Sequence, residues 1–161
     1  MCDFDYNTPG AYFITVCTAA RKCTLSHIAL AIHESPAVSL TNYGKIVEKY
    51  INELPDRLKI TVDRYVIMPN HVHIIAIVAA DDEIRAIRES PLQMRSVISK
   101  MVGYVKMNVS REIRNLYGER AVWQRGFYDH IIRNRDEYEE ISKYIYENPA
   151  RWYYDDLYSD G

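Results

Sequence analysis

Two histidines, His71 and His73, stand in the apolar segment YVIMPNHVHIIAIV (65–78), whose composition is otherwise that of a buried strand. In a strand alternate side chains lie on one face, so the two imidazoles project together, with their Cα atoms about 7 Å apart. Such a pair can bind one divalent metal ion, but two partly buried, hydrogen-bonded histidines produce the same pattern. A metal site therefore requires a third ligand from a distant part of the chain.

Two other families that carry an H-x-H segment do not fit this chain. A histidine-triad nucleotide hydrolase needs a third histidine two residues further on, where this sequence has Ile75. A two-histidine phosphoesterase needs a second histidine motif, and the remaining histidines, His27, His33 and His130, do not form one.

A third ligand and a nucleophile can both come from the segment ISKYIYENP (141–149). In a helix, with about 100° per residue, Tyr144 and Asn148 lie one turn apart on the same face as two isoleucines, while Tyr146 points away. If this face packs near the histidines, Asn148 can supply an oxygen ligand and Tyr144 a phenol. Periodicity alone is equally consistent with Tyr144 as one of 14 tyrosines filling a core and Asn148 as a helix C-cap.

The elements that must position these side chains follow from the hydrophobic patterns. We predict strands at 11–18, 60–68, 71–78 and 122–133, the last with room for an irregularity at Gly126. A Pro69-Asn70 turn joins the second and third strands, and residues 19–40 are predicted to be irregular. Helices are predicted from the cap Thr41 to the stop at Pro55, over 92–116 before Gly118, and from Asn134, which forms a capping box with Glu137, to Pro149. The first six elements match the split β-α-β plan of ferredoxin-like folds, an α+β class with an antiparallel sheet and two helices on one face, followed here by a C-terminal tyrosine-bearing helix.

Length and composition indicate an ordinary globular protein. At 161 residues and 48% apolar the chain can bury one core, and we expect a single domain over residues 1–161. No apolar run approaches the roughly 20 residues of a membrane span, and the amino terminus lacks the features of a signal peptide, so we expect a cytoplasmic protein. The three cysteines, Cys2, Cys17 and Cys23, contain no C-x-x-C pair and suggest neither a disulfide framework nor a zinc ribbon.

The charge distribution points to a region that could contact nucleic acid. The net charge is −2, but residues 85–135 contain 11 basic and 4 acidic residues. A local excess of this size can follow a phosphate backbone, although a solvated helix face is the plain alternative. We predict backbone contacts and aromatic stacking on bases. The candidates are Arg95, Lys100, Lys106, Arg111, Arg114 and Arg125 for the backbone, and Trp123, Phe127 and Tyr128 for stacking.

The segments MPNHVHIIAIV and VWQRGFYDHIIRNRDEYEEISKYIYENPARW resemble the REP-associated tyrosine transposases, relatives of the IS200/IS605 single-tyrosine (Y1) transposases among the HUH endonucleases. The likeness covers almost the whole chain, and its most specific part is H-hydrophobe-H together with Y-x-x-x-N before Pro-x-x-Trp. It implies that His71, His73 and Asn148 bind a divalent metal, Mg²⁺ or Mn²⁺, and that Tyr144 is the nucleophile. The fold it implies is the same split β-α-β plan.

The resemblance implies a metal-dependent single-stranded DNA endonuclease and strand transferase that acts beside REP-like DNA hairpins through a 5′-phosphotyrosine intermediate. Such a protein would work in a prokaryotic cytoplasm, associated with the nucleoid, as a monomer or homodimer. His130 is a candidate base for the tyrosine, with metal-bound water and a purely structural histidine as alternatives. A catalytically silent single-stranded nucleic-acid binder on the same fold is the competing hypothesis, and a replication initiator or relaxase is a third.

Overall fold

The computed structural model describes residues 10–29, 37–58, 60–78 and 95–159. Its centre is an antiparallel sheet of β1 (Gly10–Cys17), β4 (Ile60–Ile67), β5 (His71–Val78) and β6 (Tyr128–Ile132), in the order β4-β5-β1-β6. One helical connection joins β1 to β4 and another joins β5 to β6. This order is that of the predicted ferredoxin-like plan, and the α+β class is confirmed.

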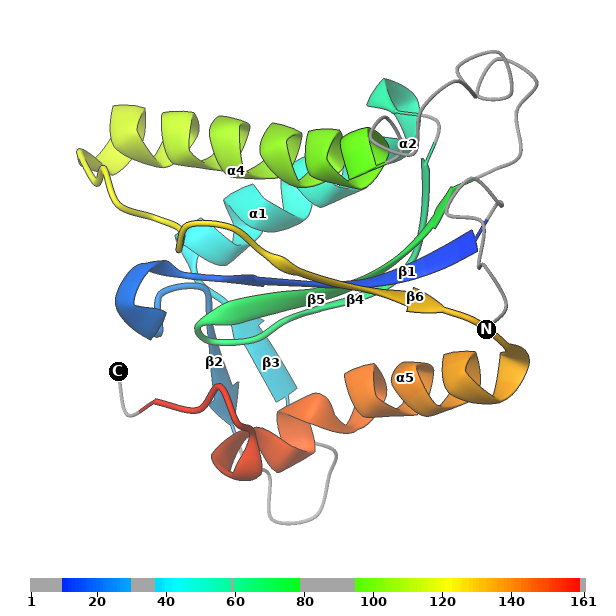
Figure 1. The fold of residues 1–161 in the computed structure, drawn as a ribbon. Coiled ribbons are helices and arrows are strands. Elements are labelled where there is room, and N and C mark those ends of the chain that lie inside the picture. The colour runs from blue at the N-terminus through cyan, green and yellow to red at the C-terminus, as the bar shows by residue number, and fades with distance from the viewer. Residues whose placement is uncertain (1–9, 30–36, 59, 79–94, 160–161) are drawn as a thin grey trace.

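Helices cover both faces of the sheet (Figure 1). On one face lie α1 (Asn42–Asn52), the short α2 (Leu54–Arg57) and α4 (Arg95–Tyr117), and on the other lies α5 (Arg135–Glu147). The two caps predicted from the sequence are present, because the Thr41 side chain accepts a hydrogen bond from the Gly44 amide and the Asn134 side chain accepts one from the Glu137 amide. The sheet is thus enclosed between two layers of helix.

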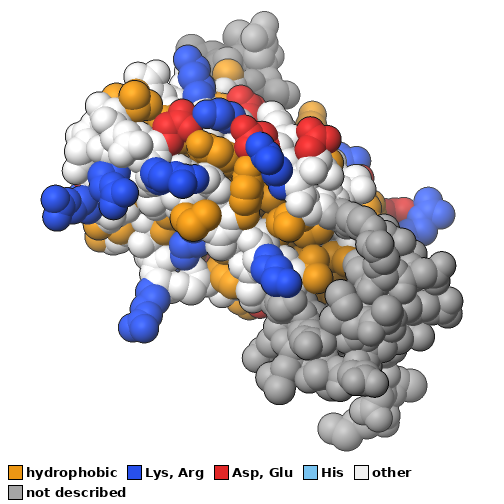
Figure 2. All heavy atoms as spheres, turned by 90° about the horizontal axis from the view of Figure 1, so that it is seen from above, with side chains coloured by type: hydrophobic (Ala, Val, Ile, Leu, Met, Phe, Trp, Pro, Cys, Tyr) orange, Lys and Arg blue, Asp and Glu red, His pale blue; other side chains and the backbone are white. Residues whose placement is uncertain are grey.

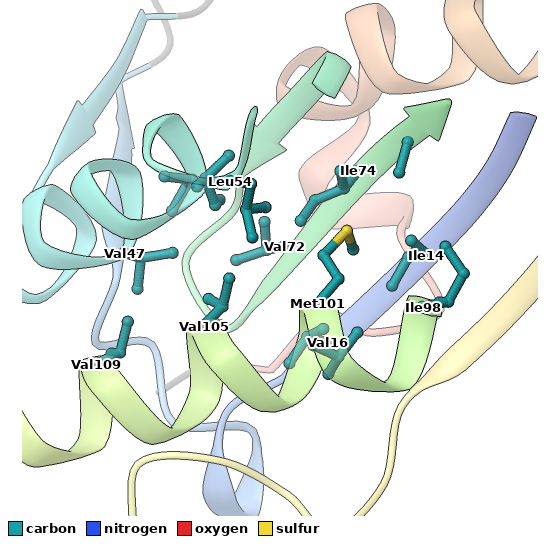
Figure 3. Packing of buried hydrophobic residues seen from close by; sticks show 14 of the residues in the cluster. Ile14, Val16, Val47, Leu54, Val72, Ile74, Ile98, Met101, Val105 and Val109 are labelled. Atoms are coloured by element: carbon teal, nitrogen blue, oxygen red, sulfur yellow. The ribbon is translucent and has the colours of Figure 1, made fainter. Parts of the chain in front are cut away.

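The main core lies between the sheet and the α1–α4 face. Alternate side chains of the two central strands point toward these helices, where they pack against residues such as Met101 of α4 (Figure 3). They are Ile14 and Val16 of β1 and Val72 and Ile74 of β5. Because strand side chains alternate, the intervening residues of β1 and β5 must face α5 instead. These intervening residues include Phe13, Thr15, His71, His73 and Ile75. The opposite face of the sheet is therefore where the polar site must lie.

One predicted segment differs from the structure, and another is shorter as a strand than its predicted range. Residues 19–40, predicted as irregular, contain the antiparallel strands β2 (Ser26–Ala29) and β3 (Ala37–Leu40). The prediction was wrong because each strand has only four residues and, among the described residues, is paired with the other alone, so no long alternating pattern marks it. Of the predicted strand 122–133, Tyr128–Ile132 forms β6, while Trp123 forms an isolated bridge with Thr18 and the Gln124 amide donates to the Cys17 carbonyl. The irregularity allowed for at Gly126 is present, since this residue adopts a φ of 81° between the two paired stretches.

The helix ends were predicted with mixed success. Gly118, with a φ of 76°, follows the last residue of α4 and donates its amide to the Arg114 carbonyl, which confirms it as the stop. Pro55 does not end the helical region but stands in the first turn of α2, a position that needs no amide hydrogen. Residues 92–94, the predicted start of α4, lie outside the described residues. Within the described ranges, none of the helices is long and apolar enough to cross a membrane.

Candidate metal and nucleophile site

The two histidines are buried at the start of β5. The Pro69-Asn70 turn closes through the Met68 amide, which donates to the His71 carbonyl at 2.8 Å, and the strand begins directly after it. His71 and His73 are 0% and 2% exposed, and their ring centroids lie 4.5 Å apart. As the strand alternation predicts, both imidazoles project together on the α5 face of the sheet.

Neighbouring side chains determine which imidazole nitrogens of His71 and His73 have a lone pair free to bind a metal ion. Nδ1 of His71 lies 2.8 Å from the Asn70 Oδ1 atom, which can only accept, so Nδ1 carries the hydrogen and Nε2 keeps a free lone pair. Nδ1 of His73 lies 2.8 Å from the Thr15 hydroxyl, which can hold that ring in the same tautomer. Partners of this kind are typical of metal-binding histidines, whose second nitrogen is held by a hydrogen bond.

Both imidazoles are neutral near pH 7. Burial lowers the pKa of His71 to about 4, a shift that the Asp155 carboxylate and the Asn148 side chain partly oppose. Burial also lowers the pKa of His73 well below its usual value, and the neighbouring His71 adds to the effect. Because a histidine must be deprotonated to bind a metal, these environments keep the pair in the ligand form.

Helix α5 brings Tyr144 and Asn148 to the histidines. Its residues Ile141 and Ile145 pack against Ile75 and other apolar side chains of the sheet. The Tyr144 hydroxyl then lies 3.4 Å from Nε2 of His73, while the Tyr144 side chain stays 42% exposed. Tyr146 is 76% exposed, so it points away from this face as predicted.

One site residue was missed by the sequence analysis. After α5 the 3₁₀ helix η2 (Asn148–Tyr154) turns the chain back, and Asp155 enters the site. Its Oδ2 atom accepts a hydrogen bond from Asn148 Nδ2 at 2.7 Å, lies 3.4 Å from the Tyr144 hydroxyl and lies 4.0 Å from Nε2 of His71. No spacing rule separates Asp155 from the other acidic residues of the C-terminal segment.

The donor atoms of the site suit a divalent metal. Ligand atoms of His71, His73 and Asp155 all lie within 4.8 Å of one another. Within the described part of the chain, Nε2 of His71 and Oδ1 of Asn148 are buried without a hydrogen-bond partner. Buried polar atoms normally have partners, so two unpartnered ones beside a histidine pair and a carboxylate fit a cation held at this position.

The nucleophile candidate is protonated at neutral pH. Burial raises the pKa of Tyr144 to about 12, and the negative charge of Asp155 acts in the same direction. The phenol must therefore lose its proton during any attack, and in this structure its hydroxyl lies 3.4 Å from Oδ2 of Asp155, to which it can donate.

The Nε2 atom of His130 lies 2.6 Å from a carboxylate oxygen of Glu137, in the first turn of α5. On β6 His130 pairs with Phe13 of β1, whose ring stacks on that of His73 at a centroid distance of 5.1 Å. Seven residues of helix, about 10 Å, separate Glu137 from Tyr144.

Four of the basic residues predicted to contact DNA lie on the face of the sheet opposite Tyr144. Lys100, Lys106, Arg111 and Arg114 belong to α4, on the other face of the sheet. Figure 2 shows that face, where basic side chains are spread among apolar and acidic ones. A hollow of about 750 Å³ on α4 is lined by Arg111, Arg114, Arg120, Met107 and Ser110.

Several of the residues predicted to contact DNA are instead engaged by other residues of the protein. Lys106 donates to the carbonyls of Gln124 and Gly126 at 2.6 and 2.8 Å, and Arg111 donates to Asn108. Trp123 and Phe127 are partly buried against the main core. Arg125 is exposed, and the side chain of Arg95 lies outside the described residues.

Tyr128 is the exception among the predicted stacking residues. It is 60% exposed on β6 and pairs with Thr15 of β1. Directly paired residues of an antiparallel sheet project from the same face, so Tyr128 shares the α5 face with His73. Of the three predicted stacking residues, Tyr128 is the one whose strand pairing puts it on the same face of the sheet as His73.

Comparison with known proteins assigns the family. The model of IS200-like transposases matches residues 20–148, a stretch that includes His71, His73, Tyr144 and Asn148. The chain belongs to the IS200-like transposase family. The match ends before Asp155.

Relatives of this IS200-like chain occur in Haemophilus influenzae. One is an uncharacterized protein, 31% identical over 168 aligned residues that cover 98% of this chain and 89% of the relative. Another, assigned as a REP-associated tyrosine transposase, is 27% identical over 69% of this chain and 65% of its own length. The resemblance to REP-associated transposases is thereby confirmed.

Solved structures support the fold of this IS200-like transposase. A REP-associated tyrosine transposase bound to a REP hairpin superposes with a TM-score of 0.61 at 21% identity, over 89% of this chain and 68% of that one. A Deinococcus radiodurans R1 protein assigned as a transposase gives a TM-score of 0.51 at 12% identity, over 85% and 88% of the two chains.

Proposed function

We propose that this transposase-family protein is a metal-dependent single-stranded DNA endonuclease and strand transferase in which Tyr144 is the nucleophile. The observation that carries the proposal is the distance of 3.4 Å between the Tyr144 hydroxyl and Nε2 of His73. His73 and the neighbouring His71 are both buried and neutral. A silent nucleic-acid binder has no use for an exposed phenol beside a metal-ligand constellation. The protein's own α5 supplies the tyrosine, which supports action in cis by a monomer.

The proposed reaction is a phosphoryl transfer to the phenol. The Tyr144 oxygen attacks a DNA phosphorus and gives up its proton, and the bond from phosphorus to the 3′ oxygen breaks. The leaving 3′ oxygen takes up one proton and becomes a 3′ hydroxyl, so the proton lost by the phenol is balanced by the one gained. The new bond is a 5′-phosphotyrosine, so the energy of the phosphodiester is retained. Attack on this bond by the 3′ hydroxyl of another strand releases Tyr144 and joins the two strands.

His71, His73 and Asn148 are the proposed holders of Mg²⁺ or Mn²⁺. Imidazole nitrogen and amide oxygen suit Mn²⁺, and Mg²⁺ accepts the same set when water and phosphate oxygens complete it. When bound, the cation would polarise the phosphate and stabilise the charge that develops on its oxygens. The two unpartnered atoms, His71 Nε2 and Asn148 Oδ1, support this assignment.

The proposed substrate is single-stranded DNA beside a hairpin, by analogy with the structural neighbour that is bound to a REP hairpin. The scissile phosphate must lie on the α5 face, where Tyr144 is exposed and Tyr128 offers an aromatic surface for a neighbouring base. Helix α4, which carries Lys100, Lys106, Arg111 and Arg114, lies on the opposite face of the sheet, so these residues can contact DNA only at a distance from the scissile phosphate.

The proposal is tested by trapping the covalent intermediate. Wild type, Tyr144→Phe and the matched control Tyr146→Phe are incubated with labelled hairpin-bearing single-stranded oligonucleotides and Mg²⁺ or Mn²⁺, then separated by denaturing electrophoresis. We expect a protein–DNA adduct with wild type and Tyr146→Phe, and none with Tyr144→Phe or after addition of EDTA. Tight DNA binding by wild type without adduct or nick in either metal would favour the silent binder.

A further inference from the structure

Asp155 is the one carboxylate among the described residues that enters the histidine site. Its Oδ2 atom lies 4.0 Å from Nε2 of His71 and 3.4 Å from the Tyr144 hydroxyl, and it accepts the amide hydrogen of Asn148 at 2.7 Å. The side chain of Asp155 is 2% exposed. A carboxylate this buried needs compensating partners, because the loss of hydration is costly.

The position of Asp155 is held from both sides. Its amide donates to the Trp152 carbonyl at 3.1 Å, and its Oδ1 atom accepts the Leu157 amide at 2.7 Å. Trp152 is buried with its ring centroid 6.0 Å from that of His71. The segment that follows is fastened to the start of β5, because Asn70 Nδ2 donates to the Leu157 carbonyl at 2.7 Å.

Asn70 therefore joins the C-terminal segment to the histidine pair. Its Nδ2 atom holds Leu157, and its Oδ1 atom holds Nδ1 of His71 and leaves Nε2 of that ring free. Through one amide side chain, the orientation of His71 and the return of the chain that places Asp155 are set together. Asn70 thus holds in place both Nε2 of His71, the proposed ligand nitrogen, and the segment that carries the Asp155 carboxylate.

We propose that Asp155 is a direct carboxylate ligand of the divalent cation, beside His71 and His73, an inference that rests on the metal site of the proposed function. Two donor atoms that share one ion at about 2.1 Å each are at most about 4.2 Å apart. The 4.0 Å between Asp155 Oδ2 and His71 Nε2 falls within this limit. The three-residue set lies within 4.8 Å, so a small inward movement closes it around an ion.

Charge gives a second reason for this ligand. Two neutral imidazoles and the amide of Asn148 carry no net charge, so without Asp155 the cation would depend on DNA phosphate for neutralisation. A carboxylate oxygen supplies one negative charge from the protein and is the donor type that Mg²⁺ and Mn²⁺ prefer. Asp155 also engages Asn148 Nδ2, which leaves Asn148 Oδ1 as the atom free to bind.

The test measures Mn²⁺ binding by the free protein, without DNA, from the electron paramagnetic resonance signal of unbound Mn²⁺. Asp155→Asn keeps the size of the side chain and an oxygen that can accept from Asn148, while it removes the charge. We expect its Kd for Mn²⁺ to rise about 10- to 100-fold. The control Asp156→Asn, at an exposed neighbouring position, should leave the Kd within about twofold. Thermal unfolding in EDTA checks that both variants fold.

A second readout separates a ligand from a residue that only positions others. In protein labelled with ¹³C at the aspartate carboxyl carbons, a bound carboxylate gives a ¹³C coupling to Mn²⁺ in electron–nuclear double resonance. That coupling should persist in Asp156→Asn and vanish in Asp155→Asn. If wild type binds Mn²⁺ and Asp155→Asn binds it equally well, or if no coupling appears, the ligand assignment is wrong while the proposed function stands. If wild type binds no Mn²⁺, the metal site itself fails, and the ligand assignment with it.

Discussion

The Tyr144 hydroxyl and Nε2 of His73 lie 3.4 Å apart, although 71 positions separate the two residues in the chain. The contact exists because β5 turns its alternate side chains toward α5, and α5 turns one helical face toward β5. A phenol that would otherwise be an ordinary surface tyrosine thereby meets a buried, neutral imidazole. The proposed chemistry and the predictions below depend on this contact and on the groups that surround it.

His130 should be dispensable for the chemical step. Its imidazole is engaged by Glu137 at 2.6 Å, about two helical turns of α5 before Tyr144, and Gln at this position can still donate to that carboxylate. We expect His130→Gln to form the DNA adduct at a rate within about threefold of wild type, whereas loss of a general base costs about 100-fold or more. Single-turnover adduct formation measures both this variant and His73→Ala, which should lose the adduct. A 100-fold loss in His130→Gln would restore His130 as the base.

Acidification should destabilise the metal-free protein through the buried histidines. The pKa of His71 is lowered from 6.5 to about 4. Between these pH values the unfolded chain binds a proton at His71, whereas His71 in the folded chain stays neutral. Above pH 6.5 His71 is neutral in both states and does not affect the free energy of unfolding. As the pH falls toward 4, proton binding by the unfolded chain lowers that free energy by roughly 3 kcal/mol. His73 acts in the same direction. Urea unfolding in EDTA at pH 7.5 and 4.5 measures this decrease. His71→Gln should show a smaller pH dependence, with exposed His27→Gln as control.

Lys106 should support the structure rather than bind DNA. Its ammonium group donates to two carbonyls of the segment before β6, and its burial lowers its pKa. We expect Lys106→Met to reduce the free energy of unfolding by about 1 to 3 kcal/mol, against less than about 0.5 kcal/mol for the exposed Lys100→Met. The salt dependence of hairpin binding should not change in Lys106→Met, whereas loss of a phosphate contact would lower its slope by about one.

Gly44 should tolerate no side chain. A Cβ at this position in α1 would lie 2.1 Å from the Leu25 carbonyl oxygen, so the helix start would have to move away from the segment before β2. We expect Gly44→Ala to destabilise the protein by more than about 2 kcal/mol. Gly103→Ala in α4 is the matched control, since a Cβ there meets nothing within 4 Å, and it should stabilise the helix by up to about 1 kcal/mol. Urea unfolding curves of both variants measure the difference.

The sequence by itself determined the elements whose patterns are local and periodic. The strand alternation around His71 and His73, the helical face of Tyr144 and Asn148, and the caps at Thr41 and Asn134 are all readable over a few residues. Each pattern reflects a repeat of the backbone itself, two residues in a strand and 3.6 in a helix. The order of the main elements then limited the topology to the split β-α-β plan that the structure has.

Only the tertiary structure decided which distant groups meet. Asp155 reaches the histidines because η2 reverses the chain and Asn70 fastens the segment beyond it, and no local pattern encodes either contact. Likewise, the basic stripe of α4 was evident in the sequence, but its separation from Tyr144 by the thickness of the sheet was not. Such relations depend on which face of the sheet each helix covers, and that is settled by burial of the whole core rather than by neighbours in the chain.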